Sequence, residues 1–143
     1  MCPKIVLLDD DPARIHEMTR CLQQQLPTCQ LAFFDNAPDM ICWLKDHLED
    51  AALICLDHDL GPNRKRDGDI FDPGTGRNVA DYLATRVPIC PILIHTSNSM
   101  AAPGMEMVLK DAGWVNFRSY PSDDLEWIQA YWINDVIDVL GRQ

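Results

Sequence analysis

The sequence predicts an α/β fold in which a five-stranded parallel sheet carries helices on both faces, in a doubly wound (βα)5 arrangement. Five short apolar segments recur along the chain, and each is followed by a segment with apolar residues at helical spacing. The third apolar segment, residues 53–56, has no polar break, which is typical of a strand buried on both faces of a parallel sheet. Polar residues directly follow several of these segments, at the edge where open α/β sheets bind ligands.

The first half of the chain accounts for three of these strands and two helices. The strands are expected at residues 4–8, 30–34 and 52–56. Asp11 is placed as the N-cap of the first helix, with Pro12 at its first helical position. Asn36 and Pro38 begin the second helix. The residues expected to face the core from these two helices are Ile15, Met18, Leu22, Leu26, Ile41, Leu44 and Leu48.

The second half supplies two further strands and three helices. A polar segment at residues 62–75 comes first and is longer than the usual strand-to-helix connection, so we expect an insertion that is either a functional lid or a surface loop. The strands are expected at residues 91–94 and 114–117. The third helix has an apolar stripe of Val79, Leu83 and Val87. The fourth helix is expected at residues 103–113 and the last at residues 122–141.

Composition and charge limit the class of protein. The 143 residues, 47% of them hydrophobic, are expected to form one globular domain over residues 1–143. The formal net charge of −10, with one basic cluster at residues 64–66, argues against a broad nucleic-acid surface. No apolar run approaches the roughly 20 residues of a membrane span, and the start does not resemble a signal peptide. The six scattered cysteines have no metal-binding spacing, so we expect a cytoplasmic protein without structural disulfides.

The predicted sheet brings a set of polar residues to one crevice. They follow the ends of strands that lie near one another around the switch point of the sheet. The set is Asp9, Asp10, Asp57, Asp59, His95, Thr96 and Asn98. In extended geometry Asp57 and Asp59 share a face and His58 points away. Several carboxylates without a matching lysine favour a hard cation such as Mg²⁺, which would attract a phosphoryl oxygen. The alternative is that Asp57 or Asp59 only caps the loop through backbone hydrogen bonds.

These segments resemble the receiver domain of two-component response regulators, with its CheY-like, flavodoxin-like fold. The resemblance covers nearly the whole chain and rests on residues 5–12, the strand that ends in Asp57, Thr96, and residues 113–121. It implies that Asp9 and Asp10, with Asp57, bind Mg²⁺ or Mn²⁺, that Asp57 is the phosphoacceptor, and that the Thr96 hydroxyl contacts the phosphoryl group. One departure is that Tyr120 stands where the receiver pattern has a lysine before the final proline.

Two motifs resemble a divergent group, the cyclic-phosphate-processing receiver domains. LDHDLG at residues 56–61 matches completely, and HTSN at residues 95–98 keeps the histidine and asparagine of the group's second motif. The resemblance implies binding or opening of a nucleotide or RNA-end cyclic phosphate, with Thr96, Ser97 and Asn98 as phosphate-binding residues.

The residues also supply the groups that such a reaction needs. His95 or His58 can serve as acid or base, because histidine titrates near neutral pH. The Asp57-x-Asp59 spacing is similar to that of haloacid-dehalogenase-type phosphatases, in which the first aspartate is the nucleophile and the second the acid. We therefore hypothesise that a phosphoryl group on Asp57 is lost quickly, with Asp59 assisting water.

Three functions remain open from the sequence. The first is a metal-dependent enzyme or binder for cyclic or terminal phosphates, with a phosphorylated small molecule or an RNA end as partner. The second is a stand-alone phosphorelay receiver that takes a phosphoryl group from a phosphodonor protein onto Asp57. The third is a degenerate receiver that binds a protein partner through Trp127 and Tyr131 on the last helix.

Overall fold

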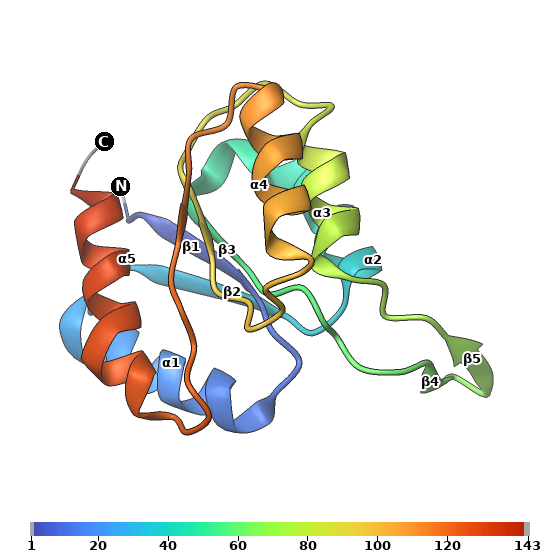
Figure 1. Ribbon diagram of the computed structural model, residues 1–143, viewed down its shortest axis with the longest axis horizontal. Helices are drawn as coiled ribbons and strands as arrows, with labels where there is room; N and C mark the ends of the chain where they lie inside the picture. The colour runs from blue at the N-terminus through green and yellow to red at the C-terminus, as the bar shows by residue number, and fades with distance from the viewer. Residues whose placement is uncertain (1, 142–143) are drawn as a thin grey trace.

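The computed structural model describes residues 2–141 and contains a five-stranded, wholly parallel sheet (Figure 1). Its strands are β1 (Lys4–Leu8), β2 (Gln30–Phe34), β3 (Ala51–Leu56), β6 (Ile92–Ile94) and β7 (Asn116–Arg118). Their order across the sheet is β2-β1-β3-β6-β7. The chain therefore adds β2 on one side of β1 and the later strands on the other side, which puts the switch point of the sheet between β1 and β3. The predicted doubly wound fold class is confirmed.

Helices cover both faces of this sheet (Figure 1). One face carries α1 (Pro12–Gln25) and the last helix, which consists of a π-helical segment, η2 (Ile128–Trp132), followed by α5 (Ile133–Leu140). The other face carries α2 (Ala37–His47), α3 (Gly76–Leu83) and α4 (Ala102–Asp111). A short 3-10 turn, η1 (Leu48–Asp50), leads from α2 into β3.

The strand sequences match this three-layer arrangement. Along β1, Ile5 and Leu7 pack toward α1 and α5, whereas Val6 and Leu8 pack toward the opposite layer. All four side chains are fully buried. A strand covered on both faces has no solvent side, which is why its sequence is apolar without alternation.

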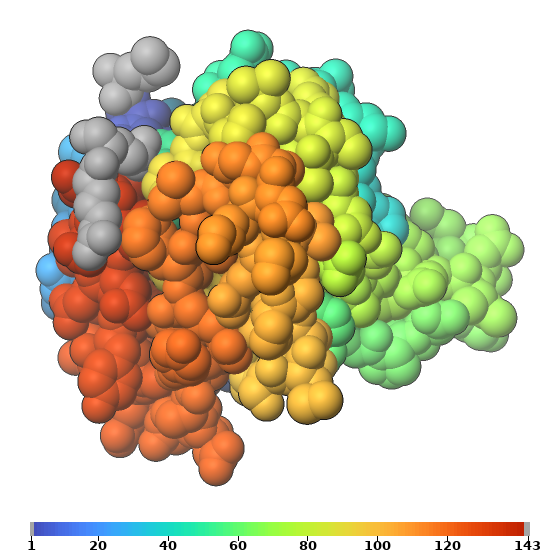
Figure 2. Space-filling view, turned by 45° about the horizontal axis from the view of Figure 1, so that its top comes forward, coloured from blue at the N-terminus to red at the C-terminus, as the bar shows by residue number. Residues whose placement is uncertain are grey.

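The insertion at residues 62–75 contains a β-hairpin that projects from the body of the domain (Figures 1 and 2). Its strands are β4 (Arg64–Arg66) and β5 (Asp69–Phe71), joined by Asp67 and Gly68 with φ angles of 54° and 86°. Asp-Gly between two strand segments is a strong hairpin signal, and it was available in the sequence. Because Arg64 pairs with Asp35 and Arg66 with Asp39, the hairpin is tied to the start of α2.

Three sequence-based expectations are wrong in detail. The last helix begins at Glu126 and not at Ser122, because the Asp124 carboxylate accepts the Glu126 N–H and caps the helix there. Val87 is 77% exposed, because α3 ends at Leu83. The last strand of the sheet starts at Asn116, two residues later than expected.

The protein-partner surface predicted on the last helix is also only partly available. Trp127 is buried, at 1% exposure, whereas Tyr131 is 64% exposed. Trp127 lies at the start of the helix and packs into the layer of α1 and α5, so it cannot serve as a surface anchor. Among residues 2–141 no helix is both long and apolar enough to cross a membrane.

Candidate functional site

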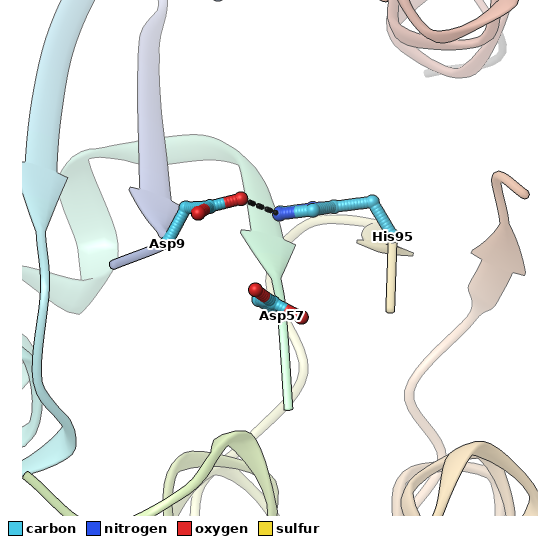
Figure 3. Close-up of side chains that lie close together, drawn as sticks. All are labelled: Asp9, Asp57 and His95. Atoms are coloured by element: carbon cyan, nitrogen blue, oxygen red, sulfur yellow. Dashed lines mark hydrogen bonds and ion pairs between the residues drawn. The ribbon is translucent and has the colours of Figure 1, made fainter. Parts of the chain in front are cut away.

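Three polar residues each follow a strand at the carboxyl edge of the sheet (Figure 3). Asp9 follows β1, Asp57 follows β3 and His95 follows β6. The parallel hydrogen-bond ladder continues past the strand ends, since the Asp57 N–H donates to the Leu8 carbonyl at 3.1 Å and the His95 N–H to the Leu56 carbonyl at 2.9 Å. Neighbouring strands therefore fix the backbone of Asp57 and His95.

The side chains of Asp9, Asp57 and His95 form a compact buried cluster. All three are at most 4% exposed. Nε2 of His95 lies 3.1 Å from Oδ2 of Asp9, and one possible metal-ligating atom from each residue lies within 4.8 Å of the other two. Figure 3 shows the Asp9 carboxylate facing the imidazole, with Asp57 beside them at the end of β3.

The two buried aspartates differ in their electrostatic environments. Burial acts to raise the pKa of Asp9, but the hydrogen bond and charge of His95, the Asp11 N–H and the Arg14 charge together leave that pKa below its ordinary value. Burial, with the charge of Asp9, raises the pKa of Asp57 to about 6. The ionised form of Asp57 is costly in such a site, so a metal cation beside it would stabilise the charged carboxylate.

Arg14 also belongs to this site, although it is not among the residues predicted from the sequence. Its Nη1 lies 3.4 Å from Oδ2 of Asp57 and 3.6 Å from Oδ2 of Asp9. The side chain of Asp11 caps α1 by accepting the N–H groups of Ala13 and Arg14, which places Arg14 in the first turn directly above the strand end. The available signal was a cation in the first turn of the helix that follows Asp9.

A cavity of about 630 Å³ opens beside the cluster. Its lining residues are Asp10, Asp11, Pro12, Arg14, Asp57, Asp59, Gly61 and Ser97. Asp10 is half-buried, and burial together with the neighbouring Asp9 charge raises its pKa. Gly61 has a φ of +83°, and a Cβ there would lie 3.2 Å from a carboxylate oxygen of Asp10.

Asp59 faces this cavity together with Asp57, as the strand geometry predicts, and it is held from two sides. Nδ1 of His58 lies 2.7 Å from Oδ1 of Asp59. The Asn98 amide donates to both Asp59 oxygens, at 3.2 and 3.3 Å. The His58 hydrogen bond, supported by that of Asn98, lowers the pKa of Asp59. His58 itself is not among the residues that line the cavity, but its imidazole contacts Asp59, so the expectation that it points away from the pair is met only in part.

The remaining predicted phosphate-binding residues occupy different positions. Ser97 lines the cavity. Thr96 is buried, and its Oγ1 accepts the Asn98 N–H at 3.0 Å, so it shapes the turn after β6. Tyr120, at the position of the receiver lysine, is 69% exposed, and the Arg118 guanidinium lies 4.8 Å from its ring centroid.

Gly76 is a second residue that the site requires and that is not among the predicted ones. It is the first residue of α3, and its N–H donates to the His58 carbonyl at 2.8 Å. An added Cβ would lie only 1.8 Å from the backbone oxygen of Asp57. Only glycine lets α3 approach the end of β3 this closely, so Gly76 fixes the backbone that carries Asp57, His58 and Asp59.

The residues present fit a hard divalent cation. Asp9, Asp10 and Asp57 are the predicted metal ligands, and carboxylate oxygens are the ligands that Mg²⁺ and Mn²⁺ prefer. The structure gathers Asp9 and Asp57 with His95 in the buried cluster, and it leaves Asp10 on the cavity wall. Four aspartates line the cavity with one arginine, so a dication would offset charge that the protein leaves unbalanced.

A family model described as "Cyclic-phosphate processing Receiver domain" matches residues 4–111 of the chain. The chain belongs to this family. The match covers the site residues identified above and ends with α4, so β7 and the last helix lie beyond it. The comparison with curated protein sequences gave no match.

Several solved structures similar to this receiver domain are described as response regulators. The domain resembles Thermotoga maritima DrrB (TM-score 0.64, 18% identity, 99% of this chain and 54% of that one). It also resembles the phosphorylated cyanobacterial phytochrome response regulator RcpA (TM-score 0.66, 14% identity, 96% of this chain and 92% of that one). A third similar structure is the response regulator domain of T. maritima CheB (TM-score 0.67, 9% identity, 99% of this chain and 96% of that one). At these identities the likeness shows the fold alone.

Proposed function

We propose that this receiver domain binds and opens the cyclic phosphate of a nucleotide or of an RNA end, with Mg²⁺ or Mn²⁺ at its acidic cluster. The observation that carries the proposal is the contact between Asp59 and Asn98. Asp59 belongs to the LDHDLG segment and Asn98 to the HTSN segment, so the two motifs that resemble the cyclic-phosphate-processing group meet beside one cavity. The description of the matching family supports the same substrate class.

Asp9, Asp10 and Asp57 would hold the cation. When bound, the cation would offset the negative charge that develops on the phosphate oxygens. His95 is fully buried and contacts Asp9, so in this proposal it orients a metal-binding carboxylate and does not touch the substrate. This differs from the direct acid or base role that the sequence predicts for it.

Asp59 is the base in the proposed reaction. Its carboxylate lines the cavity and is oriented by His58 and Asn98. It takes a proton from water as the water oxygen bonds to phosphorus, and the bond from phosphorus to one ring oxygen breaks. That oxygen then takes the proton back from the Asp59 carboxyl group, so the product is a phosphomonoester.

³¹P NMR of a 2′,3′-cyclic nucleotide incubated with the protein tests this proposal. A monoester resonance is expected with Mg²⁺ or Mn²⁺, and chelation of the metal with EDTA should abolish it. The variant Asp59→Asn should lose the activity, whereas Asp46→Asn, at an exposed position on α2, serves as the matched control. Activity that persists in Asp59→Asn at the rate of the control would refute the role of Asp59.

A second function, phosphorylation of Asp57, is supported by one observation. Oδ2 of Asp57 faces the Arg14 guanidinium at the cavity, where an incoming phosphoryl group would meet both. Incubation with a small acyl phosphate and Mg²⁺, followed by intact-protein mass spectrometry, tests it. A phosphoryl adduct in the wild type that is absent from Asp57→Asn would support the phosphorelay function. The unmodified mass under conditions where cyclic phosphates are opened would favour the enzyme.

A further inference from the structure

We propose that Arg14 is the residue that binds the phosphoryl group in this pocket, and that Trp127 holds its guanidinium in place. This inference rests on the proposed function, because it names the group that recognises the phosphate ester. It concerns two residues that the motifs do not include, one at the start of α1 and one at the start of the last helix.

A phosphate ligand needs a cation that the cavity wall otherwise lacks. The cavity has four aspartates in its lining, and Arg14 is the one lysine or arginine that lines it within residues 2–141. Tyr120 takes the position of the receiver lysine and is turned out to solvent. Arg118 does not line the cavity: its guanidinium lies 3.6 Å from Glu106, donates to the Thr96 carbonyl at 3.5 Å and stacks on Tyr120.

Arg14 has donors available for such a ligand. Its contacts to Asp57 and Asp9, at 3.4 and 3.6 Å, are longer than the roughly 2.7–2.9 Å of strong charge-assisted hydrogen bonds. Both contacts use Nη1, and in the part of the chain that the structure describes its Nε and Nη2 have no hydrogen-bond acceptor. The side chain is 20% exposed, at the cavity wall. A planar guanidinium with free N–H groups matches two oxygens of a phosphate.

Trp127 positions this guanidinium. Its ring centroid lies 5.8 Å from Cζ of Arg14, within the range of a cation–π contact. The same indole stacks on His95, with ring centroids 6.4 Å apart and planes inclined by 26°. One buried side chain therefore touches the cation and the histidine that flank the carboxylate pair, and it has few other conformations available.

Removing Arg14 should change the affinities for metal and for phosphate in opposite directions, because Arg14 contacts the carboxylates that would bind the metal and would itself bind the phosphate. Without the guanidinium, Asp9 and Asp57 are freer to bind a cation, so metal affinity should rise. Phosphate would lose its charged hydrogen-bond donor, so phosphate affinity should fall. A residue that only supports the fold would weaken both, which makes the two signs diagnostic.

The test measures both affinities in the full chain, using Mn²⁺ alone by electron paramagnetic resonance and inorganic phosphate with Mg²⁺ by isothermal titration calorimetry. Arg14→Gln should bind phosphate about tenfold more weakly or worse, in line with the loss of a charged hydrogen bond, and Mn²⁺ at least as tightly as the wild type. Arg14→Lys should recover part of the phosphate affinity. Arg20→Gln, a surface arginine on the same helix, should match the wild type for both ligands.

The positioning role of Trp127 is tested with the same two titrations. Trp127→Leu should reproduce the pattern of Arg14→Gln with a smaller change, and Trp127→Phe, which keeps an aromatic face, should restore most of the phosphate affinity. Trp114→Phe removes an equally buried indole from the opposite layer and should leave both affinities unchanged.

Three results would overturn the inference. The first is that the wild-type protein does not bind inorganic phosphate. The second is that Arg14→Gln binds phosphate as tightly as the wild type. The third is that Arg14→Gln binds both phosphate and Mn²⁺ more weakly and that Arg14→Lys does not restore either affinity. The proposed function fails separately. Absence of cyclic-phosphate opening together with Arg14-dependent phosphate binding would refute only the reaction, and opening with an unchanged KM in Arg14→Gln would refute only the role of Arg14.

Discussion

Replacing Asp57 with asparagine should stabilise the metal-free protein at neutral pH, although it removes a site residue. Burial raises the pKa of Asp57 to about 6 in the folded protein, from 3.8 in the absence of the fold. The folded state therefore holds a proton that the unfolded chain has released between these pH values, and the free energy of unfolding falls as the pH rises through this window. Above it, the wild type bears the full cost of a buried charge that asparagine does not carry.

The magnitude follows from the difference between the two pKa values. About two pH units at roughly 1.4 kcal/mol each give about 3 kcal/mol. The attraction between Asp57 and Arg14, at 3.4 Å, already contributes to this pKa and lowers it. The buried amide of asparagine has a desolvation cost of its own, which offsets part of the gain. We therefore expect the Asp57→Asn protein to be more stable than the wild type by about 1–3 kcal/mol above pH ~7, with the difference vanishing below pH ~4.

Urea unfolding at several pH values, with EDTA present, measures this difference directly. Adding Mg²⁺ should then stabilise the wild type and leave Asp57→Asn nearly unchanged, because a ligand that binds only the folded state raises its stability by mass action. A variant less stable than the wild type at high pH in EDTA would refute the reasoning, as would a stability difference that does not change with pH.

Three further predictions follow from the contacts around the cavity. Gly76→Ala should lower the free energy of unfolding by about 3 kcal/mol or more and weaken Mg²⁺ binding, because its Cβ would overlap the Asp57 carbonyl. Urea unfolding and calorimetry measure the two effects, and a variant as stable as the wild type would contradict the close approach of α3 to β3. Asn98→Ala removes a hydrogen bond that lowers the pKa of Asp59, so the acidic limb of a pH–rate profile should move to higher pH, and an unmoved limb would count against Asp59 as base. Arg66→Ala breaks an exposed ion pair with Asp39 and should leave the midpoint of thermal unfolding nearly unchanged; a clear fall in that midpoint would mean that the hairpin supports the core.

Much of the fold could be predicted from the sequence because its signals are local. The apolar run of β3 and the Asp11–Pro12 start of α1 each depend on a few neighbouring residues, and both appear in the structure as expected. The start of the last helix was misplaced because Ser122 and Asp124 both look like N-caps, and only the contact of Asp124 with the Glu126 N–H decides between them. Val87 was predicted to lie on the apolar stripe of α3 but lies beyond the end of the helix, because apolar periodicity does not indicate where a helix stops.

The candidate site divides in the same way. Asp9, Asp57 and His95 follow strands, so the topology alone predicts that they meet, and the structure brings them together. The roles of Gly76 and Trp127 could not be predicted, because they come from contacts between segments far apart in the sequence. Arg14 left a weak signal, a cation in the first turn after Asp9, but only its contact with Asp57 places it in the site. Arg14 reaches across to Asp57, and the close approach of Gly76 to the Asp57 carbonyl exists only once α3 has packed against β3.

The opening of a 2′,3′-cyclic nucleotide, followed by ³¹P NMR in the presence of Mn²⁺, tests the central claim most directly. The account predicts a phosphomonoester resonance that grows with the wild type and with Asp46→Asn, and that is absent from Asp59→Asn and from samples with excess EDTA. A cyclic resonance that stays unchanged with the wild type, at protein concentrations where Mn²⁺ binding is saturated, would contradict the proposed function and leave Asp57 phosphorylation as the activity to be tested.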